Sequence, residues 1–115
     1  MKQGKVWGTT EEIFHNGIVS VHHLSIKKGG YSSKHWHQFK ANIFHVLSGK
    51  LRIEIWQRNE SSDITVLEAG DKCYIPPHLI HSFKALSDVE CYEIYEVKLR
   101  GEDISRESVG GIEEK

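Results

Sequence analysis

Apolar and polar residues alternate over short runs along most of the chain, which is the pattern of β-strands. The clearest run is residues 18–26, "IVSVHHLSI", in which β-branched residues dominate and every second side chain shares a face. Further runs of this kind are 32–38, 42–48, 50–57, 64–68, 72–77, 81–86 and 89–99. No segment sustains an apolar period of 3.6 residues, so the pattern predicts no helix.

Residues typical of turns separate these runs. Paired glycines in "KKGG" (27–30) supply positive φ, and Gly49 divides two runs into a hairpin. Pro76 and Pro77 end a strand, because proline cannot donate to a sheet ladder. The pattern predicts an all-β fold, an antiparallel sandwich or barrel. We expect the chain to form a single domain over residues 1–115. Its barrel core should cover about residues 18–98, and a polar tail should cover about residues 101–115.

Composition limits the classes of partner and compartment. The chain has 115 residues and a formal net charge of -1, with no basic face of the kind that binds nucleic acid. No apolar run approaches the length of about 18 residues that a membrane-spanning helix needs. The first residues lack the apolar core of a signal peptide, so we expect a cytoplasmic protein. Cys73 and Cys91 fit that reducing compartment and are interpreted as small core residues, with a disulfide as the less favoured alternative.

Histidine is the unusual component, at eight residues of 115. His35 and His37 are two apart in "SSKHWHQ", so on a strand they face the same side and could bind one ion. A solvated surface pair is the alternative. Asn42 begins the next run, and His81 follows the proline turn, with His78 three residues before it.

This spacing resembles the two sequence motifs of the cupins, a family of small antiparallel β-barrels related to the jelly roll. Five residues fall on the spacing of the first motif, four of them with the family's residue and Asn42 where the family usually has glutamate: Gly29, His35, His37, Asn42 and Gly49. Three positions match the second motif: Gly70, Pro76 and His81. His78 and Ala85 replace a glycine and an asparagine of that motif.

The resemblance implies a divalent metal ion as cofactor (Zn, Fe, Mn or Ni), held by His35, His37, His81 and the residue at position 42. Three imidazoles leave coordination positions open for water or substrate, as catalysis requires. Asn42 stands where a carboxylate ligand is expected. It is a weak oxygen ligand, a group that hydrogen-bonds a ligand, or a sign that the metal role is being lost.

A narrower likeness is to the cupin domain of type II phosphomannose isomerases. It rests on the segments "KVWGTTEEIF", "FHVLSGKLRIEI" and "YEVKLRGEDISR". The likeness implies a metal-dependent isomerase whose small-molecule substrate is a sugar or sugar phosphate. A three-histidine Fe(II) dioxygenase is the enzymatic alternative, and a small-ligand binding or sensor module is the non-enzymatic one.

Two residues are candidates for acid/base catalysis. Glu93 and Glu96 cannot face the same side of one strand, and the inward one would have a raised pKa. Glu96 matches the "Glu-Val" position of the resemblance and is therefore the candidate. His78 is the second candidate, although an exposed loop histidine is the simpler interpretation. His45 should face away from Asn42, and one of the neighbours His22 and His23 must face inward.

The chain is also expected to form a homodimer. A barrel built from two sheets has exposed edge strands, which invite pairing with a second chain. The apolar content before residue 27 exceeds what a minimal barrel needs.

Overall fold

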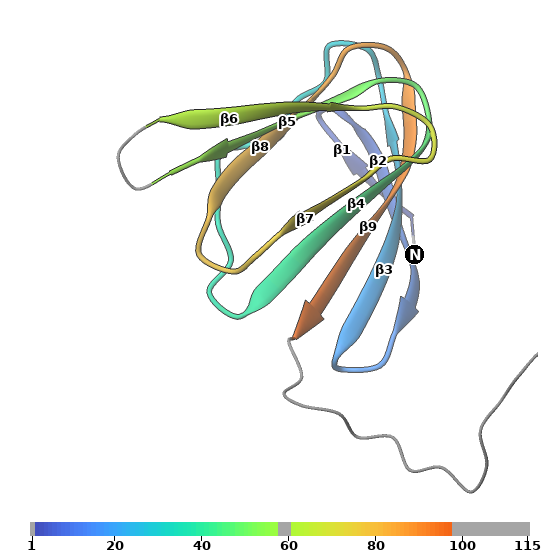
Figure 1. Ribbon diagram of the computed structural model, residues 1–115. Coiled ribbons are helices and arrows are strands. Elements are labelled where there is room, and N and C mark those ends of the chain that lie inside the picture. The colour runs from blue at the N-terminus through green and yellow to red at the C-terminus, as the bar shows by residue number, and fades with distance from the viewer. Residues whose placement is uncertain (1, 58–60, 98–115) are drawn as a thin grey trace, which may run out of the picture.

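The computed structural model describes residues 2–57 and 61–97, which form two antiparallel sheets packed as a sandwich (Figure 1). The predicted tail at 101–115 lies outside this range. The six-stranded sheet has the order β1-β2-β3-β9-β4-β7, and the three-stranded sheet has the order β6-β5-β8. The strands are β1 (Lys2–Lys5), β2 (Gly8–His15), β3 (Val19–Ile26), β4 (Lys40–Ser48), β5 (Leu51–Trp56), β6 (Ser62–Leu67), β7 (Lys72–Ile75), β8 (Ile80–Ala85) and β9 (Val89–Val97). Within the described part of the chain no helix could span a membrane.

Alternation along the strands creates one apolar core between the sheets, which confirms the all-β prediction. On β4, Phe44 and Val46 are buried, whereas Leu47 faces outward and is exposed. The inner residues of the two sheets form a single cluster that includes Leu24, Ile26, Leu51, Ile53, Val89 and Cys91. Cys73 packs against this cluster, and both cysteines are free, as expected of small core residues.

The N-terminal residues add a hairpin that the predicted core, starting near residue 18, did not contain. β1 and β2 pair with each other, and β2 pairs with β3, so the six-stranded sheet grows by two strands. Trp7, in the turn between them, packs edge-on against Phe83 of the opposite sheet at a centroid distance of 5.2 Å. The polar stretch "GTTEE" gives β2 no apolar alternation, which is why the pattern did not reveal it.

The segment 32–38 was predicted as a strand, and that prediction is wrong. Residues 31–35 run beside β8, where two isolated bridges join Tyr31 to Lys84 and His35 to His81, and the amide of Ser32 donates to the carbonyl of Phe83. Backbone hydrogen bonds between His35 and His81 run in both directions, at 3.0 and 2.8 Å. The segment has few apolar side chains to bury, so pairing stays local instead of extending into a ladder.

Gly49 allows a turn that other residues resist. Its φ is +87°, and a Cβ built there would lie 2.1 Å from the carbonyl oxygen of Asp88. Gly70 has a similar φ of +90° but open space around it.

Gly49→Ala should therefore lower the free energy of unfolding by more than Gly70→Ala, which carries only the left-handed backbone strain of about 1–2 kcal/mol. Urea unfolding of both variants measures the difference, and equal losses would contradict the steric argument.

Candidate metal centre

Three histidines from two parts of the chain meet between the sheets. His81 lies on β8. His35 and His37 lie on the irregular segment 32–38, which runs beside β8 in space. One ring nitrogen from each of the three lies within 4.8 Å of the others. The ring centroids are 4.5 Å apart for His35 and His81 and 5.2 Å apart for His35 and His37. The structure thus brings together the three imidazoles that the sequence singled out.

Hydrogen bonds to backbone carbonyls orient two of these rings. Nδ1 of His35 lies 2.8 Å from the carbonyl oxygen of Ser33, and Nδ1 of His81 lies 2.9 Å from that of Leu79. Each Nδ1 therefore carries the proton and donates it, so Nε2 of each ring keeps the lone pair with which an imidazole binds a cation. In His37, Nε2 is buried and has no hydrogen-bond partner.

Asn42 is fully buried beside the histidines. Its amide nitrogen donates to a carboxylate oxygen of Glu93 at 3.1 Å and lies 3.3 Å from Nε2 of His81. Its Oδ1 is buried and has no partner. Buried polar atoms are rarely left unsatisfied. A bound cation would satisfy Nε2 of His37 together with the other two imidazoles, so the three-histidine donor set fits a divalent metal ion.

Burial keeps the imidazoles neutral. It lowers the pKa of His81 to about 4, against a smaller opposing effect of the hydrogen bond to Leu79. Burial also lowers the pKa of His37, with further contributions from His35 and Lys40. Neutral imidazole is the form that binds metal, so both rings are ready to do so at neutral pH.

Glu93, rather than Glu96, is the inward carboxyl of β9. Glu93 is buried, and desolvation raises its pKa to about 7, although hydrogen bonds from Tyr95 and Asn42 favour the charged form. Glu96 has the opposite parity on the strand and pairs with Val19 and Ala41, away from the histidines. Both faces of "VECYEIYEV" carry apolar residues, so alternation alone did not decide between the two glutamates.

The remaining sequence candidates lie outside the cluster or at its border. His78 is exposed in the turn before β8 with a φ of 76°, and its backbone amide donates to the carbonyl of His37. His45 faces outward beside Tyr92, at a ring distance of 6.4 Å. His22 is the inward member of its pair, 5.5 Å from the ring of Tyr95.

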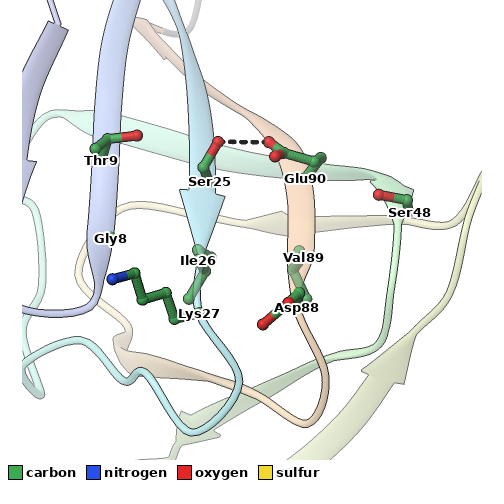
Figure 2. A pocket seen from close by; sticks show the side chains of 9 residues that line it. All are labelled: Gly8, Thr9, Ser25, Ile26, Lys27, Ser48, Asp88, Val89 and Glu90. Carbon is green, nitrogen blue, oxygen red and sulfur yellow. Dashed lines mark hydrogen bonds between the residues drawn. The ribbon is translucent and has the colours of Figure 1, made fainter.

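A cavity of about 280 Å³ opens beside the cluster. Its walls include Lys5, Trp7, His22, His35, Glu93 and Tyr95. This volume is at the small end of the range for ligand pockets, which suits a compact molecule. A second hollow of about 270 Å³ is lined by polar residues such as Ser25 and Glu90 and contains none of the three histidines (Figure 2).

Comparison with known proteins identifies the fold. A family model described as "Cupin domain" matches residues 22–95. The fold matches an oxalate decarboxylase from Bacillus subtilis, described with Mn(II) centres, at a TM-score of 0.76 and 22% identity, over 84% of this chain and 27% of that chain. It also matches KdgF from Halomonas sp. at a TM-score of 0.75 and 18% identity, over 86% of this chain and 89% of that chain. The chain thus spans about a quarter of the decarboxylase. No curated protein matches.

Removing one imidazole tests the cluster. His81→Ala should weaken zinc binding by more than about 100-fold, because it removes a ligand atom rather than a group that orients one. His45→Ala is the matched control, since it removes an imidazole from the outer face of the same sandwich. Calorimetric zinc titration of the untagged proteins measures both. Equal losses in the two variants would contradict the inward assignment of His81.

Metal binding should weaken in acid, because protons compete for the same nitrogen lone pairs. Burial lowers the pKa of His37 and brings the pKa of His81 to about 4, so these two rings take up protons only below the ordinary histidine pKa of about 6.5. Zinc affinity should decline as the pH falls toward about 4, by up to about tenfold per pH unit for each imidazole that is protonated. Calorimetry across this range measures the decline. An affinity that stays constant down to that pH would contradict histidine ligation.

Proposed function

The chain belongs to the cupin family, and on that premise we propose that it is a metal-dependent enzyme acting on a small molecule. The reaction we propose is isomerisation of a sugar or sugar phosphate. The observation that carries the proposal is the three-histidine cluster, in which Nε2 of His37 is buried and unpartnered, beside a cavity that His35 and Glu93 line. A site built only for stability would not leave that atom unsatisfied.

The residues divide the chemistry between them. A divalent ion held by the three histidines would polarise carbonyl and hydroxyl oxygens of a substrate. Glu93 lines the cavity, and its pKa of about 7 keeps both protonation states populated near neutral pH. It can therefore take a proton from one carbon and return it to the next, as aldose–ketose interconversion requires. The amide nitrogen of Asn42 that donates to Glu93 also lies 3.3 Å from Nε2 of His81, so Asn42 connects the acid to the histidines.

The choice of metal is part of the proposal. The Mn(II) centres named for the Bacillus subtilis oxalate decarboxylase support manganese among the candidates, together with zinc, iron and nickel. The imidazole nitrogens themselves suit several of these ions. Metal analysis of protein purified without an affinity tag would identify the ion.

A second candidate is a three-histidine Fe(II) dioxygenase. The observation in its favour is that the three clustered ligands are all imidazoles, with a neutral amide where a carboxylate would complete the usual iron triad. Oxidised product after incubation with Fe²⁺ and O₂ would favour this reaction. Thermal stabilisation by a ligand without turnover would favour a binding module instead.

Replacing the inward carboxyl should stop proton transfer without removing the metal. Glu93→Gln retains an oxygen that can accept the hydrogen bond from Asn42, so metal content should persist while turnover of an aldose falls by at least about 100-fold. Glu96→Gln is the comparison, because this glutamate matches the family position but faces away. A coupled assay for ketose formation measures turnover. Loss in Glu96→Gln but not in Glu93→Gln would reverse the assignment.

A further inference from the structure

The N-terminal hairpin forms one wall of the cavity beside the metal cluster. It consists of β1 and β2 and lies at the edge of the six-stranded sheet (Figure 1). Three of its residues line the cavity that Glu93 also lines: Gln3, Lys5 and Thr10. All three precede residue 22, where the match to the family model begins. The hairpin therefore contributes cavity residues from outside the matched segment.

Strand register decides which side chains of the hairpin face this cavity. Gln3 of β1 pairs with Thr10 of β2, and Thr10 pairs with Leu24 of β3, whose side chain is buried in the core. Paired residues on neighbouring strands share a face of the sheet, so Gln3 and Thr10 face inward. Lys5 is two residues from Gln3 and shares that face, whereas Lys2 has the opposite parity and faces outward.

The turn beside Lys5 is held by the rest of the domain. Trp7 packs against Phe83 of the three-stranded sheet, and its carbonyl accepts a hydrogen bond from the amide of Lys27 at 3.0 Å. Because Trp7 follows Lys5 by two residues, these contacts fix the end of β1 relative to the cavity. The backbone of Lys5 is thus in place before a ligand binds, which lowers the entropy lost on binding.

Lys5 supplies a positive charge that is not used in the fold. It is the only lysine or arginine among the residues that line the cavity, and it is exposed, so a ligand can reach its amino group. Its charge acts at the site, since it favours the ionised form of Glu93 and so opposes the effect of burial on the pKa of that carboxyl. Within residues 2–57 and 61–97, the side chains of Lys5, Gln3 and Thr10 make no hydrogen bond or ion pair.

We propose that Lys5 binds an anionic group of the substrate, a phosphate monoester or a carboxylate, and that the hairpin thereby selects anionic sugars over neutral ones. This inference rests on the proposed function, because it assigns the substrate class of the same site. An ammonium group is a compact point charge that suits both anions, and Gln3 and Thr10 can donate further hydrogen bonds to their oxygens. Recognition by Lys5 and proton transfer by Glu93 then use different parts of one substrate.

Three hexoses that differ only at carbon 6 test the preference: glucose, glucose 6-phosphate and glucuronate. In calorimetric titrations of the untagged protein, at least one of the two anionic sugars should bind about tenfold more tightly than glucose. This is the effect of one charge-assisted hydrogen bond. The tighter of the two identifies the anion as phosphate or carboxylate. Binding of glucose as tightly as both anionic sugars, or no binding of either anionic sugar, would overturn the proposal.

Substitutions locate the preference at Lys5. Lys5→Met removes the charge but keeps an apolar stem, so the affinity for the anionic sugar should fall by about tenfold while that for glucose stays the same. Lys5→Arg keeps the charge and should keep the preference. Lys2→Met is the matched control, because it removes an outward lysine of the same strand, and it should change neither affinity. A preference that survives Lys5→Met, or that Lys2→Met reduces equally, would overturn the assignment.

Turnover separates this inference from the proposed reaction. If an anionic sugar binds through Lys5 but gives no ketose in the coupled assay, the anion site stands and the isomerase is contradicted. If ketose forms from glucose and from glucose 6-phosphate with equal kcat/KM, and Lys5→Met changes neither value, the isomerase stands and the anion site is contradicted.

Discussion

The antiparallel register of β4 and β9 places Asn42 opposite Tyr95 and Phe44 opposite Glu93 on the inner face of the larger sheet. Polar and apolar side chains therefore separate along the interior, with Glu93 and Tyr95 toward the histidines and Cys91 and Val89 in the apolar core. A slip of one residue would turn Asn42 outward and Ile43 inward. The site depends on this register, because it is Asn42 of β4 whose amide nitrogen lies 3.3 Å from Nε2 of His81 on the opposite sheet.

Burying polar groups between two sheets costs free energy unless they find partners. The apolar end of the sandwich contributes the stability that offsets this cost, through residues such as Phe44 and Leu51 that are almost fully buried. At the polar end, contacts that link Glu93, Asn42 and His81 satisfy several of the buried donors and acceptors. Two buried atoms, Nε2 of His37 and Oδ1 of Asn42, have no hydrogen-bond partner. Such exceptions are typical of functional sites, where a ligand completes what folding leaves open.

Alternation and turn residues were enough to predict an all-β domain, because each central strand buries one face. They missed β2, whose side chains are largely exposed and so carry no burial signal. The three histidines could be predicted from their spacing in the sequence. The segment that carries His35 and His37 is not a strand, however, and is joined to β8 by isolated bridges. Glu93 could not be chosen over Glu96, since β9 is apolar on both faces.

The hydrogen bond between Asn42 and Glu93 constrains how these two positions can evolve. An amide has one donating and one accepting end, and here the donating end is committed to a carboxylate. A glutamate introduced at position 42 would place a second carboxyl beside the buried carboxyl of Glu93. Two neighbouring carboxyls cannot both ionise without repulsion, so one of the pair would hold its proton to a higher pH. A substitution at either position therefore changes the charge that the other can carry.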